Sequence, residues 1–340
     1  MSIALPYAHG VPPASGLLRA RPEDFLVEET LGFEPAGEGE HAFVLIEKSG
    51  ANTEWVARRL ADAAGVAPLG VGYAGLKDRH AVTRQTFSVH LPGRVDPDWH
   101  ALAIPGVRVL GATRHHRKLK RGAHRGNLFR IRLRELRGDV DAIDARIAAV
   151  RARGVPNYFG EQRFGRDAQN LALAEALFAG RRLPRAQHGF ALSAARAELF
   201  NALLARRVIA QSWDRPLDGE VFMLDGTNAI FGPEPWSDDL ARRLAARDIH
   251  PTGPLWGRGE PRSTSVARAL ESEVAVAHAT FAHGLERAGL EQERRALRLC
   301  PLDLGHAWEA GDLTIDFALR AGAFATTVLR ELCDWHSAAA

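Results

Sequence analysis

The stretch LFRIRLR, at Leu128–Arg134, alternates apolar and basic side chains. Successive side chains of a β-strand point to opposite faces, so the alternation predicts a strand with one face in the core and one cationic face. Similar alternation occurs at Gln85–Leu91 and near the C-terminus at Leu313–Leu319, and a further strand is predicted at Ala42–Glu47. Because the C-terminal strand pattern resembles the N-terminal part, we expect the C-terminal piece to return to the first domain.

Helical patterns separate these strands. Asn52 is suited to cap a helix that ends at Gly65, and a second helix with apolar residues at helical spacing ends at Gly154. From there to about His306 the texture changes to helices joined by turns rich in proline and glycine. This change predicts a separate folding unit in the middle of the chain.

Two local signals are found inside this middle region. Ser193 is suited to begin a helix, and Asp225-Gly226 is a hairpin signal between two short apolar segments. The sequence therefore predicts an α/β (α+β) protein with a split first domain and an inserted one. The predicted division is 1–154, 155–306 and 307–340.

Length and composition are those of an ordinary globular protein. The chain has 340 residues and 46% hydrophobic residues, so two folding units with substantial cores are expected. Its two cysteines, Cys300 and Cys333, match no disulfide framework and no zinc-ligand spacing. The N-terminal segment, Met1–Gly16, lacks the features of a signal peptide, and no stretch approaches the roughly 20 apolar residues of a membrane span. These features predict a cytoplasmic protein.

Positive charge is concentrated in one region. Between Arg108 and Arg137 there are eleven Lys and Arg residues and a single acid, Glu135, which gives a local net charge of +10 in a chain whose net charge is +3. Such a run is often only a solvated face, but the scarcity of acids favours contact with a polyanion such as RNA. A flexible basic loop between Arg114 and Arg125 is predicted to contact the RNA backbone through Arg117, Lys118, Lys120, Arg121 and Arg125.

One carboxylate lies among basic side chains in GLKDRHAVT, at Gly75–Thr83. The cations that flank Asp78 favour its charged form, so it is predicted to be an oxygen nucleophile or the anchor of an ion pair rather than a proton donor. The alternative is a solvated loop aspartate in a cluster of surface charges. Asp78 is expected to lie on the loop that leads into the strand at Gln85–Leu91.

Cofactor motifs are weak or missing in the sequence. GVGYAG at Gly70–Gly75 matches G-x-G-x-x-G, but a dinucleotide site requires a strand before it and a helix after it, so a tight turn is the simpler interpretation. The sequence contains no H-E-x-x-H and no G-x-S-x-G. We therefore expect no metal and no cofactor, although a methyltransferase that binds S-adenosylmethionine through the glycine run is an alternative.

The GLKDRHAVT motif resembles the catalytic motif of the tRNA pseudouridine synthase D (TruD) family. Other strings resemble further blocks of that family in the same order: RPEDFLVEE at Arg21–Glu29, the segment Glu34–His41 that ends in EGEH, the segment Arg114–Phe129, VPNYFGEQRFG at Val155–Gly165, LSAAR at Leu192–Arg196, LFN at Leu199–Asn201 and GAFATTVLRE at Gly322–Glu331. The resemblance extends over nearly the whole chain.

The resemblance implies roles for individual residues. Asp78 takes the position of the family's nucleophile, and Phe25 that of a substrate contact. Asn127 and Phe129 fall on the block beside the target uridine, and Phe324 on the block that helps to hold the base. Arg330 aligns with the basic residue that pairs with the catalytic aspartate, and Lys77 and Arg79 compete with it for that role.

The resemblance also implies a fold and an activity. The fold is a split catalytic domain with a mixed, mainly antiparallel sheet and an inserted, family-specific α/β domain. The activity is isomerisation of uridine 13 of transfer RNA to pseudouridine, by a monomer without cofactor or obligatory protein partner. A non-catalytic RNA-binding protein is the alternative, since it would keep the basic region and have no need of Asp78.

Overall fold

The computed structural model describes residues 5–337; residues 1–4, part of the N-terminal segment considered above, and residues 338–340 lie outside the described part. The chain divides into two compact units. The sheet unit comprises residues 13–143, 301–325 and 333–337, and the helical unit comprises residues 5–12, 144–300 and 326–332. The division into a catalytic domain and an inserted domain stays a prediction. Within residues 5–337 no helix is both long enough and apolar enough to cross a membrane.

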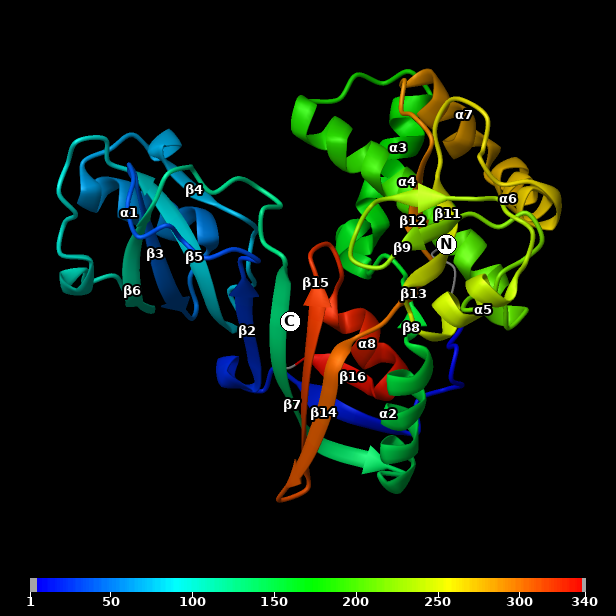
Figure 1. Cartoon of the computed structure of the whole chain (residues 1–340), viewed down its shortest axis with the longest axis horizontal. Helices are drawn as coiled ribbons and strands as arrows, with labels where there is room; N and C mark the ends of the chain where they lie inside the picture. Colours follow the sequence, from blue (N-terminus) through cyan, green and yellow to red (C-terminus); the bar gives the residue numbers. More distant parts are fainter. Residues whose placement is uncertain (1–4, 338–340) are drawn as a thin grey trace. The chain divides into compact units, whose positions relative to one another are not determined.

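The sheet unit is built on a 10-stranded sheet (Figure 1). Its main path runs β14-β15-β7-β2-β5-β3-β6, with β1 paired to β7 and β16, and β4 paired to β5. Only the β2–β5 and β1–β16 pairs among those described are parallel, so the sheet is mixed and mainly antiparallel, as predicted. The strands are β1 (Ala14–Leu18), β2 (Phe25–Thr30), β3 (His41–Lys48), β4 (Val71–Tyr73), β5 (Val82–His90), β6 (Val107–His115), β7 (Gly126–Gly138), β14 (Leu302–Glu309), β15 (Asp312–Arg320) and β16 (Asp334–Ser337).

Strand β7 contains the alternating stretch and pairs with β15, β2 and β1. Phe129, Ile131 and Leu133 are buried, which confirms the predicted core face. The predicted cationic face is neutralised by acids from other strands and turns. Its ion pairs include Arg130 with Asp316 at 2.7 Å, Arg132 with Asp312 at 2.9 Å and Arg134 with Asp24 at 2.6 Å. The arginines therefore fasten neighbouring segments of the sheet unit.

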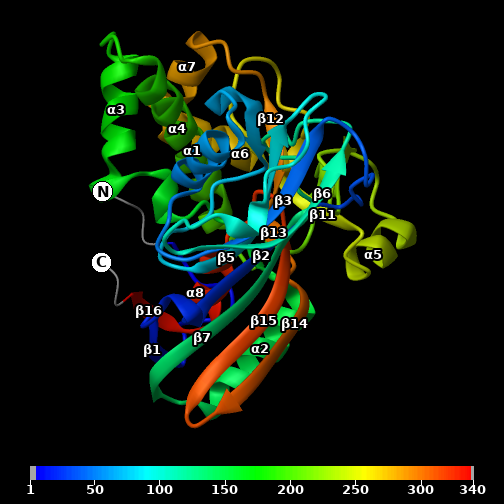
Figure 2. The same cartoon turned by 90° about the vertical axis from the view of Figure 1, so that its left-hand side faces the viewer.

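Helix α1 (Thr53–Ala64) packs on the sheet beside β4 and β5 (Figure 2). Val56 and Leu60 lie in one core cluster with apolar residues of β3 and β5, since residues four apart share a helix face. Gly65 ends the helix with a φ of 60°, the left-handed conformation that glycine adopts without steric cost. Asn52 stands at the N-cap as predicted, although its side chain makes no capping hydrogen bond.

The helical unit surrounds helix α4, which buries Leu199, Phe200, Leu203 and Leu204. The predicted helix start at Ser193 is wrong: α4 begins at Arg185, directly after Pro184, and Ser193 lies inside it. The hairpin at Asp225-Gly226 is confirmed, because β9 (Phe222–Leu224) and β10 (Ile230–Phe231) pair antiparallel on either side of it.

The helices of the helical unit are α2 (Asp141–Arg153), α3 (Gln169–Phe178), α4 (Arg185–Ile209), α5 (Asp238–Ala245), α6 (Ser265–Ala277), α7 (Ala279–Arg287) and α8 (Ala325–Leu332). Of these, α2 and α8 each begin in the sheet unit. The strands are β8 (Val155–Pro156), β9 (Phe222–Leu224), β10 (Ile230–Phe231), β11 (Ile249–Leu255), β12 (Glu293–Ala296) and β13 (Arg298–Leu299).

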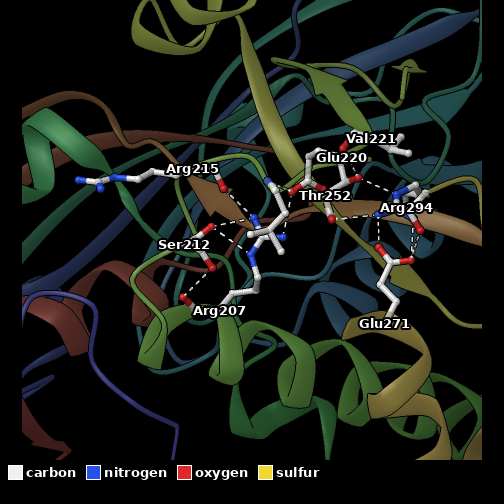
Figure 3. A network of polar contacts seen from close by, with 10 residues as sticks. Arg207, Ser212, Arg215, Glu220, Val221, Thr252, Glu271 and Arg294 are labelled. Carbon is white, nitrogen blue, oxygen red and sulfur yellow. Dashed lines mark hydrogen bonds and ion pairs between the residues drawn. The ribbon is translucent and has the colours of Figure 1, made fainter. Parts of the chain in front are cut away.

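Buried ion pairs connect the elements of the helical unit (Figure 3). Arg207 of α4 pairs with Glu220 at 2.9 Å, and both side chains are only 2% exposed. Arg294 of β12 pairs with Glu271 of α6 at 2.6 Å, and both of these side chains are also buried. Buried charges are stable only when they are paired and hydrogen-bonded. The two pairs therefore tie α4, α6, β12 and the segment before β9 into one network.

Candidate active site

The loop that carries Asp78 connects β4 to β5 and is held by buried polar groups. The amide of Lys77 donates to Thr53 Oγ1 at 3.0 Å, and the side chain of Gln85 donates to the carbonyl of Gly75 at 3.2 Å. Thr53 and Gln85 are themselves joined by a 3.0 Å hydrogen bond. Because these partners come from α1 and β5, the position of the loop is set by the core of the sheet unit.

Asp78 is partly exposed and its carboxylate is held at both oxygens. Its side chain is 28% exposed, and Oδ2 lies 2.8 Å from Nη2 of Arg19. Its Oδ1 accepts a hydrogen bond from the amide of His80 at 2.9 Å. An ionised carboxylate is an acceptor only, so both contacts suit the charged form that a nucleophile requires. The exposed remainder of the group is open to a substrate.

Arg19 is the residue that sequence reasoning missed. Its guanidinium lies over the ring of Phe25 at 4.3 Å, and its backbone has a φ of 57°, which residues other than glycine rarely adopt. Strain of this kind is often found at functional sites, where the surrounding structure imposes it. Arg19 lies just before the Arg21–Glu29 block, separated from it by Ala20, but nothing local linked it to Asp78.

The three predicted supporting cations have other partners or none. Lys77 forms a buried ion pair with Glu29 at 2.6 Å. Arg79 is exposed and has no carboxylate partner within residues 5–337. Arg330 lies on α8 in the helical unit, where it donates to the carbonyls of Leu5 and Pro6 and pairs with Glu331. A supporting role for these cations stays a prediction.

A buried ammonium group lies beneath the loop. Lys48, at the end of β3, is 1% exposed and donates through Nζ to the carbonyls of Ala51 at 2.9 Å, Asp78 at 3.2 Å and Lys77 at 3.4 Å. Burial lowers the pKa of Lys48 to about 8, and the charges of Asp78 and Lys77 act on it in opposite directions. Lysine is seldom buried, so its sequence position gave no reason to single it out.

Phe25, Asn127 and Phe129 share one face of the sheet with Glu29. In the β2–β7 register Asn127 lies opposite Glu29, and directly opposite residues point to the same face. Phe25 and Glu29 share that face because side chains alternate along β2. Since Glu29 binds Lys77, this is the face over which the Asp78 loop is fastened.

The two phenylalanines of this face pack against each other, and the asparagine side chain has an oxygen without a hydrogen-bond donor. Phe25 and Phe129 meet edge to face at 6.3 Å, and they are 4% and 8% exposed. Asn127 Oδ1 is buried and has no hydrogen-bond partner within the described part of the chain. A buried acceptor without a partner is costly unless a ligand satisfies it. That atom is therefore a candidate contact for a base edge.

Phe324 lies in the turn after β15 and is half-buried. The turn is fastened to the end of the basic loop, because the amide of Ala321 donates to the carbonyl of Arg125 at 3.1 Å. The sheet unit thus contains Asp78, Phe25, Asn127, Phe129 and Phe324, and Arg330 is the predicted site residue that belongs to the helical unit.

The basic loop after β6 is anchored, which corrects the expectation that it is flexible. The amide of Leu119 donates to Ser88 Oγ at 2.9 Å, and Leu119 itself is buried. Arg121 lies over the ring of Tyr73 at 4.2 Å and near Glu54. The other four predicted RNA contacts have no carboxylate partner among residues 5–337; they are Arg117, Lys118, Lys120 and Arg125. Their charges are available to a polyanion.

The glycine run next to this loop is not the expected tight turn. Gly72 lies within β4, where a Cβ atom would stand 2.4 Å from the carbonyl oxygen of Leu119. Glycine is needed there because the basic loop passes directly over the strand. No helix follows the run, since the chain continues from β4 through the Asp78 loop into β5. This arrangement lacks the helix of a dinucleotide fingerprint.

Within the described chain, no three His, Cys, Asp or Glu side chains gather closely enough to bind one metal ion. The polar groups described at the site are a paired carboxylate and an unsatisfied amide, and the aromatic rings of Phe25 and Phe129 lie on the same sheet face as that amide.

Comparison with known proteins agrees with this arrangement. The sequence model of the family described as tRNA pseudouridine synthase D (TruD) matches residues 4–180 and 169–332. A tRNA pseudouridine synthase D of Methylococcus capsulatus is 54% identical, with coverage of 97% of this chain and 94% of the relative. One of Xanthomonas campestris pv. campestris (strain B100) is 52% identical, with coverage of 99% and 96%. A solved structure assigned to TruD from Methanosarcina mazei has the same fold, with a TM-score of 0.74 at 22% identity over 96% of this chain and 95% of that one. With a family match over nearly its whole length and close relatives of the same description, this chain belongs to the tRNA pseudouridine synthase D (TruD) family.

Proposed function

We propose that this TruD-family isomerase converts uridine 13 of transfer RNA to pseudouridine, with Asp78 as its nucleophile. The observation that carries the proposal is the Arg19–Asp78 ion pair, which lies beside a sheet face with a buried, unpartnered Asn127 Oδ1. The proposal includes a transfer RNA as substrate, a cytoplasmic location, and action as a monomer without cofactor or obligatory protein partner.

The reaction needs one bond exchanged for another. The bond between N1 of uracil and C1′ of ribose breaks, a bond between C5 and C1′ forms, and the proton of C5 is exchanged for one on N1. Asp78 can add to C6 of the ring or attack C1′ of the ribose. Either route forms a covalent intermediate, which splits one difficult step into two easier ones. The isomerisation is neutral in electrons, so no oxidant or reductant takes part.

The surrounding residues act on the nucleophile and on the detached base. Arg19 binds the Asp78 carboxylate and fixes its direction, since the guanidinium is itself held against Phe25. Asn127 Oδ1 can accept a hydrogen bond from N3–H of uracil. Phe25, Phe129 and Phe324 supply the apolar surface on which the base turns. Extrusion of the base from folded RNA costs stacking energy that backbone contacts offset.

The direct test is to incubate the protein with bulk unmodified transfer RNA and to map pseudouridine at single-nucleotide resolution. We expect one new site, at position 13. Modification at another position would contradict the target and leave the chemistry intact. Absence of any modification would favour the non-catalytic RNA-binding alternative.

The lowered pKa of Lys48 predicts that the enzyme loses activity at alkaline pH. Its ammonium holds the carbonyls of Lys77 and Asp78, and its pKa of about 8 means that this charge is lost as the pH rises through that value. We expect the single-turnover rate of the wild type to fall above about pH 8. Lys48→Arg should move this fall to higher pH, and Lys48→Met should be slower at pH 7 and show no such fall.

Unfolding does not explain this expected loss. The pKa of Lys48 in the folded chain is lowered from 10.5, so between about pH 8 and 10.5 the unfolded chain binds the proton and the folded chain does not. The Lys48 contribution to the free energy of unfolding therefore rises over that range. Melting temperatures measured at the same pH values separate the two effects. A wild-type rate that stays constant from pH 7 to 9.5 would contradict the role of Lys48.

The basic loop predicts a salt-dependent contribution to RNA affinity. Arg117→Gln combined with Lys120→Gln should weaken transfer RNA binding and make the plot of log Kd against log salt less steep, by about one unit for each lost phosphate contact. The control is Arg58→Gln with Arg59→Gln on α1, which removes the same charge from another exposed surface of the sheet unit. Equal changes in both double variants would mean that the loop has no special part in binding.

A further inference from the structure

Two arginines of the helical unit pack against one aromatic ring. Arg295 of β12 has its Cζ atom 4.3 Å from the ring centre of Phe159, and Arg163 has its Cζ atom 5.2 Å from the same centre. Arg163 ends a short 3-10 helix at Glu161–Arg163, and Phe159 packs edge to face on Phe200 of α4. The two cations are thus held near each other by the core of this unit.

Neither arginine has a counter-charge within residues 5–337. Arg163 donates to Ser193 Oγ at 2.7 Å, and Arg295 donates to Oδ1 of Asn157 at 2.6 Å. Those acceptors are neutral. The contrast with Arg207 and Arg294 is direct, because each of these buried arginines of the same unit has a glutamate partner. Two guanidinium groups without a counter-charge therefore contact the same aromatic ring.

Burial acts on both groups, and the charge of Arg163 acts on Arg295 as well. Burial lowers the pKa of Arg163 and, together with the charge of Arg163, lowers the pKa of Arg295 to about 10. Both guanidinium groups are still protonated at neutral pH. An anion between them would relieve the repulsion and replace part of the lost hydration.

Both arginines have N–H donors left over for an anion. Nε and Nη2 of Arg163 and Nη1 of Arg295 donate to no protein atom of the described chain. Both residues are partly exposed. Guanidinium groups match the oxygens of a phosphate through two parallel hydrogen bonds, and a fixed aromatic platform reduces the entropy lost on binding.

We infer that Arg163 and Arg295 together bind one phosphate group of the RNA backbone. The inference rests on the proposed function for the identity of the RNA, and it adds a phosphate site in the helical unit, separate from the basic loop of the sheet unit.

The first test is the salt dependence of transfer RNA binding by Arg163→Gln. We expect an affinity about tenfold lower at moderate salt and a slope of log Kd against log salt that is smaller by about one unit. Arg163→Lys keeps a positive charge and should restore the slope. The control is Arg206→Gln on α4, an exposed arginine paired with Glu273 in the same unit, which should leave the slope unchanged. An unchanged slope in Arg163→Gln would overturn the inference.

The second test uses inorganic phosphate and no RNA. At constant ionic strength, phosphate should raise the melting temperature of the wild type more than chloride does, because a ligand that binds only the folded state stabilises it. The extra rise should be lost in Arg163→Gln, whose own melting temperature reports whether the variant folds. An equal phosphate effect in both proteins would contradict the site.

Failure of this inference can be told apart from failure of the proposed function. If the wild type forms pseudouridine at position 13 and Arg163→Gln keeps the wild-type slope, the phosphate site is wrong and the function stands. If no pseudouridine forms and the variant loses both slope and phosphate effect, the site stands and the function is wrong.

Discussion

Asp78→Asn is expected to abolish pseudouridine formation and to leave transfer RNA binding within about twofold of the wild type. The amide is no nucleophile, so loss of the covalent step should lower the single-turnover rate by on the order of 10⁴-fold or more. The substituted side chain has nearly the same shape as the aspartate, and its amide oxygen could still accept the hydrogen bond from the backbone N–H of His80. The measurement is single-turnover formation of pseudouridine, with binding followed separately by filter retention.

A matched control distinguishes lost chemistry from lost charge. Asp62→Asn on α1 removes a carboxylate whose ion pair with Arg59 is exposed, so its rate should stay near that of the wild type. An Asp78→Asn protein that modifies RNA at more than a tenth of the wild-type rate would rule out Asp78 as the nucleophile. If the wild type itself binds RNA without modifying it, the non-catalytic alternative gains support.

Glu220→Gln is expected to be the most destabilising of these changes. It leaves the Arg207 guanidinium buried without its counter-charge, although two backbone carbonyls, of Ser212 and Arg215, still accept from it. Removing one partner of a buried ion pair typically costs about 3–5 kcal/mol. A loss of that size should lower the melting temperature by roughly 10 °C for a unit of this length. Urea and thermal unfolding of purified protein measure it.

The double variant provides the decisive comparison. Arg207→Met with Glu220→Leu removes both charges, so it should recover most of the stability lost in Glu220→Gln. The control pair is Arg206 with Glu273, which is exposed, and Glu273→Gln there should cost less than about 1 kcal/mol. If Glu220→Gln unfolds at the wild-type midpoint, the buried pair does not stabilise the helical unit.

Strand patterns were readable from sequence because they depend on neighbouring residues only. The alternation in β7 and β15 gave the correct core face in both strands, since the period of two is a local property. The neutralised arginine face was not readable, because its acids come from β15 and from the turn before β2. Counting charges along the chain therefore overestimated the free positive charge of the region.

The same distinction applies to the site. The position of Asp78 on a loop before a strand followed from the local pattern, and its ion pair with Arg19 depended on the pairing of β2 with β5, which no local signal specifies. The prediction of a helix start at Ser193 was wrong for a related reason. Its capping preference is a local tendency, and the helix that begins at Arg185 continues through it because the apolar face of α4 is buried along its length.

The left-handed backbone at Arg19 lowers the stability of the folded chain. A residue held in a sparsely populated conformation costs the folded state about 1–3 kcal/mol, which the surrounding contacts must offset. Under the proposed function, this cost is part of what orients the Arg19 guanidinium toward Asp78 before a substrate arrives, which is the trade-off between stability and activity expected of a preorganised catalyst.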